Sequence, residues 1–153
     1  MRETNGMSDI VIVPSHEGCF TCGPDNSNGL RLAIEHAEET AYCELTLGER
    51  FQSYNGTVHG GIIASIADSL MLNLVHRRFG GYPLTGRLEM RYKRRIKVGQ
   101  TIVAEARISS TTRKTVWADC EVRSGGQICS TGRAMFLLCT SCVGGLIVCF
   151  PAA

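Results

Sequence analysis

The stretch that most constrains the fold is residues 60–75, where apolar side chains recur at intervals of three and four residues. That spacing gathers them on one face of an α-helix. The recurring residues are Ile62, Ile63, Ile66, Ala67, Leu70, Leu74 and Val75. Asp68 is the only formal charge in this stretch. A helix this apolar needs cover on most of its sides, so the sequence predicts that the rest of the chain wraps around it.

Polar and glycine-rich residues come directly before this helix. Residues 55–61 read Asn-Gly-Thr-Val-His-Gly-Gly. The first turn of a helix leaves backbone N–H groups without intrahelical partners, and Gly60 and Gly61 let a ligand approach them closely. With the positive end of the helix dipole, these groups suit a carbonyl oxygen that gains negative charge. Two turns further along, Asp68 is a candidate base or nucleophile.

Length and composition indicate one globular domain. The chain has 153 residues, of which 44% are hydrophobic and 20% charged. The net charge of +2 gives no reason to expect a nucleic-acid partner. The first 18 residues lack a signal-peptide pattern, and the apolar run 143–150 is too short to span a bilayer. We therefore expect a cytoplasmic protein without a membrane partner.

The eight cysteines are expected to be reduced thiols, because no export signal is present. Cys19 and Cys22 form one Cys-x-x-Cys pair, and Cys139 and Cys142 form a second. A structural zinc site needs four ligands, and the two pairs together offer four cysteine ligands for such a site. We favour the alternative, small buried thiols in a turn and at a strand end, and expect no metal.

Alternation of apolar and polar residues predicts six strands around the helix. Two precede it and four follow it in a meander, and the helix is expected to end near Gly80 and Gly81. The predicted strands are 30–37, 40–47, 87–96, 101–109, 115–123 and 128–138. A curved antiparallel sheet that wraps one central helix buries all of these apolar faces, so the fold class is α+β.

No repeat, linker or low-complexity tract divides the chain. We expect a flexible lead over residues 1–18 and a single domain over residues 19–138. Residues 139–153 form an apolar, cysteine-rich tail to which the sequence assigns no role.

Several of these motifs resemble one family. Residues 51–61, Phe-Gln-Ser-Tyr-Asn-Gly-Thr-Val-His-Gly-Gly, followed by Ile-Ala-Asp68, are similar to the hotdog-fold acyl-CoA thioesterases of the phenylacetate-pathway (PaaI-like) type. Residues 19–23 with Gly29-Leu30, and residues 84–92, also match. An Asp at the ninth position after the His, within the same order of strands, makes the resemblance specific. It covers about residues 19–138 and implies the hotdog fold.

The resemblance also implies a site. Gly60 occupies the place whose backbone N–H polarises the thioester carbonyl, and Asp68 the place of the general base or nucleophile. In this family two protomers pair so that the sheet continues across a dimer, and Asp68 then serves a carbonyl bound at Gly60 of the other protomer. Thr85 matches a hydroxyl that helps to hold the attacking water in some members; a plain strand-start hydroxyl is the alternative. His59 is expected to cap or pack the turn rather than to transfer a proton.

Other residues are candidates for contact with the substrate. Many members carry an Asn six residues before the His, where this chain has Ser53. The side chain that orients water or carbonyl is therefore left open among Gln52, Ser53 and Asn55. The basic residues Arg91 and Lys93 suit the phosphates of coenzyme A, although a solvated sheet face is the commoner origin of such a pattern.

The sequence thus predicts an acyl-CoA thioesterase that forms a homodimer or homotetramer and needs no metal or cofactor. One alternative is an acyl-CoA sensor that binds without turnover, against which the retained Asp68 argues. A hydratase or dehydratase on the same fold is another, although the His-plus-acid motif it would use is not found. The last alternative is a zinc-binding or redox protein that uses its cysteines for function. The acyl group is not predicted.

Overall fold

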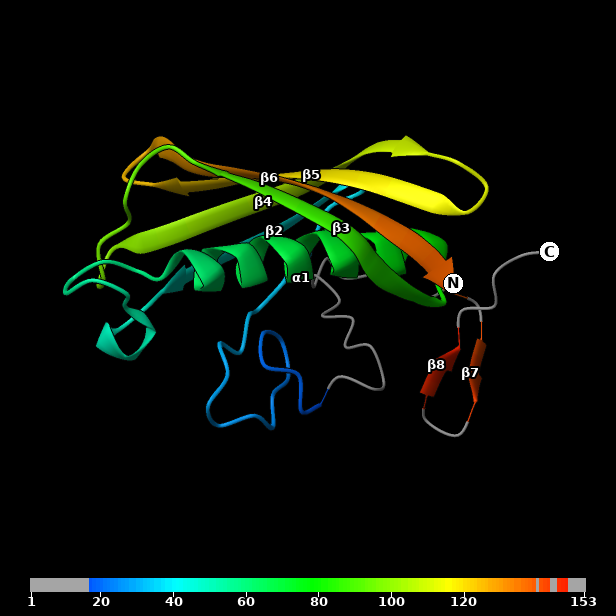
Figure 1. Ribbon diagram of the computed structural model, residues 1–153, viewed down its shortest axis with the longest axis horizontal. Helices are drawn as coiled ribbons and strands as arrows, with labels where there is room; N and C mark the ends of the chain where they lie inside the picture. Colours follow the sequence, from blue (N-terminus) through cyan, green and yellow to red (C-terminus); the bar gives the residue numbers. More distant parts are fainter. Residues whose placement is uncertain (1–16, 140, 144–145, 149–153) are drawn as a thin grey trace, which may run out of the picture.

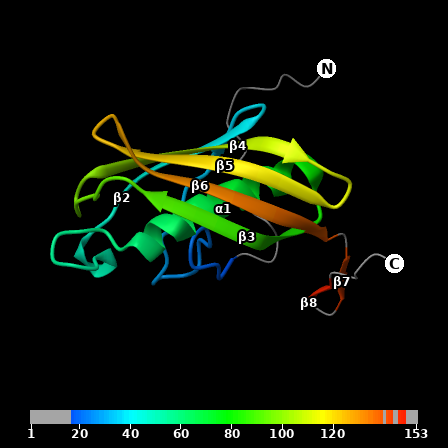
Figure 2. The same ribbon diagram turned by 45° about the horizontal axis from the view of Figure 1, so that its top comes forward.

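One long helix, α1 (Gly60–Phe79), runs along the inner side of a curved sheet (Figures 1 and 2). The computed structural model describes residues 17–139, 141–143 and 146–148. His59 caps the start of α1, and Gly80, with a φ of 69° that L side chains rarely adopt, ends it. These bounds agree with the predicted helix. Among the described residues, no helix combines the length and the apolar composition needed to cross a membrane.

The main sheet has six antiparallel strands in the spatial order β1-β2-β4-β5-β6-β3. Their bounds are β1 Glu35–His36, β2 Thr40–Thr46, β3 Tyr82–Tyr92, β4 Thr101–Thr111, β5 Thr115–Ser124 and β6 Gln127–Cys139. A short 3-10 helix, η1 (Glu49–Phe51), precedes α1. The predicted fold class, α+β with about six curved antiparallel strands around one helix, is confirmed.

The first predicted strand, 30–37, is wrong for most of its length, because only β1 forms there. The chain before β1 pairs with the preceding loop instead: the Leu32 N–H donates to the carbonyl of Thr21 at 2.8 Å. Arg31 has a φ of 49°, which breaks the extended backbone that alternation requires. Leu32 is nevertheless buried, so its apolar character reports the core rather than a strand.

The predicted meander of four strands is also wrong in part. Strands β4, β5 and β6 form a meander, but β3 pairs with β6 and not with β4. The connection from β3 to β4 is held away from a hairpin turn, because the Ile96 carbonyl accepts the N–H of Val58 at 2.9 Å and Lys97 bridges to Thr57. As a result β3, with 11 residues, is an edge strand of the sheet.

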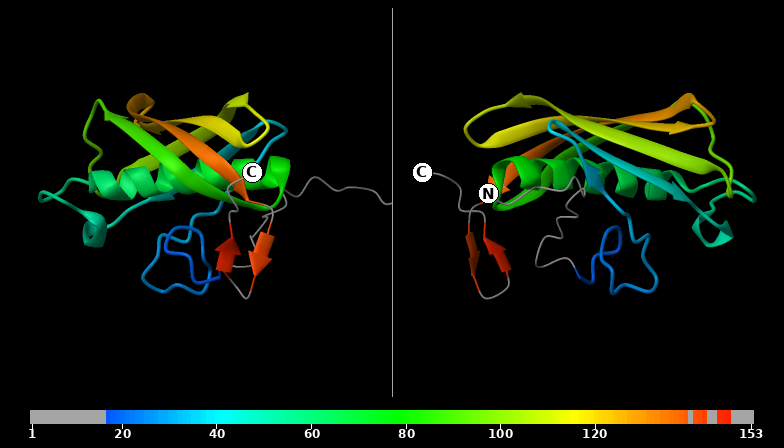
Figure 3. Two further views of the ribbon diagram at one scale, coloured as in Figure 1. Left: turned by 45° about the vertical axis from the view of Figure 1, so that its right-hand side comes forward. Right: turned by 180° about the vertical axis from the view of Figure 1, so that it is seen from behind.

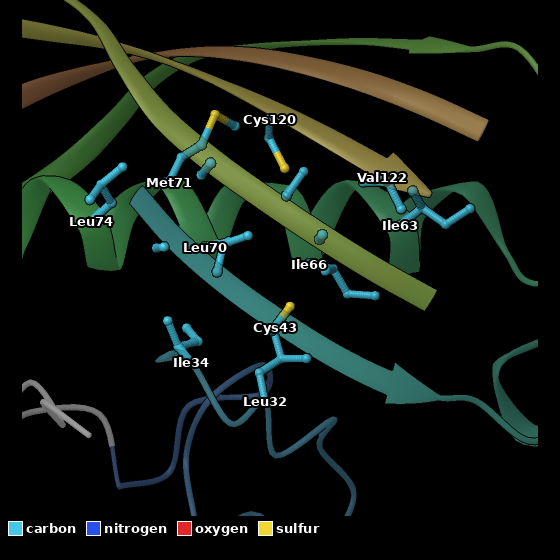
Figure 4. Close-up of a cluster of buried hydrophobic side chains, with 14 of the residues drawn as sticks. Leu32, Ile34, Cys43, Ile63, Ile66, Leu70, Met71, Leu74, Cys120 and Val122 are labelled. Carbon is cyan, nitrogen blue, oxygen red and sulfur yellow. The ribbon is translucent and has the colours of Figure 1, made fainter. Parts of the chain in front are cut away.

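The core lies between α1 and the inner face of the sheet, where the helix and strand side chains interdigitate (Figure 4). Its members from α1 include Ile63, Ile66, Leu70, Met71 and Leu74. Cys43 of β2 and Cys120 of β5 point into the same core and are almost fully buried. These two thiols act as small apolar side chains.

Among the described residues, five cysteines are thiols and not disulfides, as predicted: Cys19, Cys22, Cys43, Cys120 and Cys129. Cys139, at the end of β6, is disulfide-bonded, so the prediction of a reduced thiol is wrong there. A cysteine-rich segment follows it, which places further thiols within a few residues. Because a disulfide sulfur is not a thiolate ligand, the four-thiol zinc site is lost as an alternative.

Part of the predicted tail forms a separate two-stranded ladder of β7 (Ser141–Val143) and β8 (Leu146–Val148). The other tail residues beyond Cys139, and residues 1–16 of the predicted lead, lie outside the described residues.

Candidate active site

The start of α1 is held in place by hydrogen bonds from the residues around it. The N–H of His59 donates to the carbonyl of Phe51 at 2.8 Å. The Nδ1 atom of His59 accepts the N–H of Gly61 at 2.9 Å. His59 therefore caps the helix, the role that the sequence favours, and the Gly61 N–H is already engaged.

The N–H of Gly60 is available in a way that the Gly61 N–H is not. Within the described part of the chain it has no hydrogen-bond acceptor. The Gly60 carbonyl accepts a hydrogen bond from the hydroxyl of Tyr92, the last residue of β3, at 2.8 Å. A β-carbon added at Gly60 would lie 3.4 Å from the Tyr92 ring. The helix start thus presents one free donor, fixed in position by the edge strand.

Asp68 lies two turns further along α1, next to the other end of β3. The Thr85 hydroxyl donates to Oδ1 of Asp68 at 2.8 Å. Burial raises the pKa of the Asp68 carboxyl above its ordinary value, and the Thr85 hydrogen bond offsets only part of that increase. A carboxylate with a raised pKa is a stronger base, so the site favours proton abstraction by Asp68.

A β-bulge directs Thr85 towards Asp68. The register between β3 and β6 shifts between Thr85 and Arg87, which leaves Gly86 as the extra residue. Space also favours glycine there, because a β-carbon would lie 3.0 Å from Cε of Met135. The predicted strand begins only after Gly86, so sequence reasoning missed the bulge. An isolated glycine inside a strand pattern is the signal that finds such bulges.

Gly60 and Asp68 cannot contact the same small group within one chain. They are eight residues apart in one helix, and a rise of 1.5 Å per residue separates them by about 12 Å along the axis. A thioester carbonyl polarised by the Gly60 N–H is therefore out of reach of Asp68 in the same chain.

Between these two ends, β3 exposes apolar side chains on the face that looks towards α1. Leu88 is 37% exposed and Tyr92 52%, and Met90 is half-buried between them. Their partners on β6 are small and buried, which identifies the shared face as the inner one. Sequence reasoning placed Tyr92 inside the predicted strand 87–96 and missed its contact with the helix start.

The polar residues before the helix form a turn of their own. The Oε1 atom of Gln52 accepts the N–H of Gly56 at 2.9 Å, and the N–H of Ser53 donates to the carbonyl of Thr57 at 2.8 Å. The side chains of Ser53 and Asn55 are exposed. Gln52 therefore organises the turn, and no hydrogen bond within the described residues joins this turn to Asp68.

The two predicted basic contacts are placed differently from each other. Arg91 lines a cavity of about 560 Å³ on the outer face of the sheet, away from α1, together with Glu89, Arg107, Asp119, Glu121 and Arg133. Lys93 is exposed and directly follows Tyr92. Both residues thus lie at the end of β3 that holds Gly60, next to Tyr92, but Arg91 faces away from α1. Within the described residues, no three His, Cys, Asp or Glu side chains could share a metal ion.

The sequence model of the thioesterase superfamily matches residues 55–130, which include Gly60, Asp68 and the strands β3 to β5. The chain belongs to the thioesterase superfamily. This match agrees with the enzyme class that the sequence predicts, a thioester hydrolase. No curated protein matches the chain.

Solved structures share the fold of this chain. One thioesterase superfamily protein has a TM-score of 0.72 and 22% identity over 79% of this chain, which spans only 60% of that protein's length. A mutant of the phenylacetic acid degradation protein PaaI from Thermus thermophilus has a TM-score of 0.65 and 23% identity, covering 70% of this chain and 92% of PaaI. A Streptococcus mutans protein bound to acetyl-CoA has a TM-score of 0.64 and 20% identity, and the match covers 69% of this chain and 86% of the Streptococcus mutans protein.

Proposed function

We propose that the protein hydrolyses an acyl-CoA thioester to a carboxylic acid and coenzyme A, at a site that two copies of the chain build together. The observation that carries this proposal is the pair of groups on α1: the free Gly60 N–H at its start and the Thr85-bonded Asp68 two turns later. One is an electrophile-activating donor and the other a base, which are the two groups that ester hydrolysis needs.

Gly60 acts on the carbonyl. Its N–H donates to the thioester oxygen, and the positive end of the α1 dipole favours the negative charge that develops there. Tyr92 holds the Gly60 carbonyl, and His59 holds the next N–H, so the donor does not reorient during the reaction.

Asp68 acts on water. Its carboxylate takes a proton from a water molecule that attacks the carbonyl carbon, and Thr85 orients the carboxylate. The tetrahedral intermediate then expels the coenzyme A thiolate as the C–S bond breaks, and the thiolate gains a proton. Direct attack by Asp68 is the alternative: it expels the coenzyme A thiolate and leaves a mixed anhydride on Asp68, which water then hydrolyses. After a single turnover in ¹⁸O-water, label on Asp68 identifies direct attack with hydrolysis at the Asp68 carbonyl carbon, because the general-base route labels only the product acid.

A second copy is needed because Gly60 and Asp68 of one chain are about 12 Å apart along the axis of α1. The edge strand β3 offers the surface, since its 11 residues leave one row of backbone groups open and expose Leu88 and Tyr92. Two copies of β3 that pair antiparallel about a two-fold axis place the Thr85 end of one beside the Tyr92 end of the other. Asp68 of one copy then lies near Gly60 of the other. A tetramer of two such dimers is the further assembly that we predict.

The ligand class is supported by the neighbours. The Streptococcus mutans protein binds acetyl-CoA, and a related Streptococcus pneumoniae structure holds coenzyme A. We propose that neither metal nor cofactor takes part, so dialysis against a chelator leaves the rate unchanged.

The experiment uses two variants. Gly60→Pro deletes the donor at the first helical position, where proline is tolerated, and His59 already has the φ of −64° and ψ of 131° that a residue before proline prefers. Asp68→Asn deletes the base. Gly60→Ala is the matched control, because it keeps the N–H. Activity is the release of free thiol from a panel of acyl-CoAs.

Each of the two variants alone is expected to lose about 10²-fold or more in kcat. Mixed dimers, co-expressed with two tags and purified through both, contain one site with an intact Gly60 and an intact Asp68. They are expected to regain about half of the wild-type activity. Inactive mixed dimers would show that the two groups act within one chain. Stoichiometric binding without thiol release by the wild-type protein would favour the sensor instead.

A further inference from the structure

The loop that contains Cys19 and Cys22 packs against α1 on the side away from the sheet (Figure 3). The hydroxyls of Thr21 and Ser69 hydrogen-bond to each other. The side chain of Asn73 donates to the carbonyl of Ser69 at 2.8 Å and also lowers the pKa of the Cys22 thiol. Because Thr21 and Asn73 are buried, the Cys-x-x-Cys turn is fixed on the helix, next to the residue that follows Asp68.

The two thiols are close enough to react with each other. Each thiol contributes to the pKa shift of the other, and Sγ of Cys19 lies 3.2 Å from Oγ1 of Thr21. The N–H of Gly23 donates to the carbonyl of Cys19 at 3.0 Å, which closes one tight turn over the motif. Residues three apart in such a turn have α-carbons roughly 5–6 Å apart, within the range that a disulfide bridges.

The environments of the two thiols differ. Burial raises the pKa of Cys19, but hydrogen bonds from the Cys22 backbone and from Thr21 outweigh it, so the pKa falls below its ordinary value. Burial, together with the Cys19 thiol, raises the pKa of Cys22 to about 11. Cys19 therefore has more thiolate character than Cys22, the asymmetry expected of an attacking and a resolving cysteine.

We propose that Cys19 and Cys22 are a redox-active dithiol that exchanges with low-molecular-weight disulfides. This inference goes beyond the proposed function and does not depend on it. The Cys19 thiolate attacks one sulfur of the disulfide R–S–S–R, which forms a mixed disulfide at Cys19 and releases R–S⁻. Cys22 then loses its proton and attacks Sγ of Cys19, which forms the Cys19–Cys22 disulfide and releases the second R–S⁻. The protein dithiol is oxidised, and R–S–S–R is reduced to two thiols.

The experiment incubates the reduced, folded, full-length protein with oxidised glutathione and maps its peptides by mass spectrometry. The wild-type protein is expected to yield a peptide with a Cys19–Cys22 disulfide. Cys22→Ser is expected to trap glutathione on Cys19, and Cys19→Ser to react at Cys22 about tenfold more slowly or less. The buried Cys43 and Cys120, whose pKa values burial raises to about 12, serve as unreactive internal controls.

A structural role for the two thiols makes a different prediction. Both serine variants would then lower the melting temperature, and the folded wild-type protein would form no Cys19–Cys22 peptide at any ratio of oxidised to reduced glutathione. That result, or equal trapping at Cys19 and Cys22 in the two variants, overturns the proposal. Thiol release from acyl-CoA is measured separately, so failure here leaves the proposed hydrolysis intact.

Discussion

Asp68→Asn is expected to make the protein more stable while it removes most of the activity. Burial raises the pKa of the Asp68 carboxyl, so the folded state disfavours its charged form. A pKa raised by one unit corresponds to a penalty of about 1.4 kcal/mol on the charged form in the folded state. Because the carboxyl is only partly buried, solvent screens part of this penalty, and we expect a gain of about 0.5–1 kcal/mol at pH 7. The amide oxygen of the variant still accepts the Thr85 hydrogen bond.

The pH dependence of this gain has a definite sign. A carboxyl whose folded pKa is raised contributes full stability below its unfolded pKa, of about 3.9, and loses that stability as the pH rises through its folded pKa. At pH 7 the wild-type protein therefore carries the penalty and Asp68→Asn does not. Below the unfolded pKa both side chains are neutral, and the two proteins are expected to have the same stability.

Urea unfolding at pH 7 and near pH 3.5 measures the gain, and thiol release from acyl-CoA measures the activity. The activity is expected to fall by about 10²–10⁴-fold, the usual effect of removing a general base. Asp119→Asn is the matched control. The Asp119 side chain is 42% exposed, lies on the outer face 3.6 Å from the Arg133 guanidinium, and its substitution should leave the activity unchanged. A variant that is less stable than the wild type at pH 7, or that keeps its activity, would refute the reasoning.

Three further substitutions test neighbouring contacts. Thr85→Val removes the hydrogen bond that lowers the Asp68 pKa, so the acidic limb of the kcat/KM profile should move to higher pH, whereas Thr85→Ser should leave it in place. Tyr92→Phe removes only the hydroxyl that holds the Gly60 carbonyl. Because one hydrogen bond contributes a net 0.5–1.5 kcal/mol, kcat should decrease by about 3–10-fold with little change in KM. An unchanged kcat would exclude the contact from catalysis. Ser130→Ala removes a fully buried hydroxyl that has no hydrogen-bond partner among the described residues, so the free energy of unfolding in urea should rise by about 0.5–1 kcal/mol. A decrease would reveal a hidden partner.

The helix and most strands could be predicted because their signals are local. Apolar spacing within residues 60–75 and the Gly80 stop define α1 without reference to any other element. Alternation likewise gives β4, β5 and β6 to within a few residues. At residues 30–34 the same alternation was misleading, because it records which side chains are buried and not which backbone groups pair.

The strand order and the role of Tyr92 could not be predicted, because both depend on contacts between distant segments. Alternation gives β3 an apolar face but does not show that it pairs with β6 at the edge of the sheet. Tyr92 is half exposed only because of that edge position, and it meets Gly60 only because the chain folds back over the helix start. Gly60, Asp68 and Thr85 were found through motif and family resemblance rather than through periodicity.

The edge strand explains why a site divided between two ends of one helix can still work. β3 touches both ends, through Thr85 at Asp68 and through Tyr92 at Gly60, so each half of the proposed site is fixed by the same strand. Any symmetric antiparallel pairing of β3 with its copy reverses the order of these contacts, and therefore places the Asp68 end of one copy opposite the Gly60 end of the other. In the proposed assembly, the strand that positions the catalytic groups is also the strand that pairs the subunits. Association and activity should therefore be lost together when the β3 edge is disrupted.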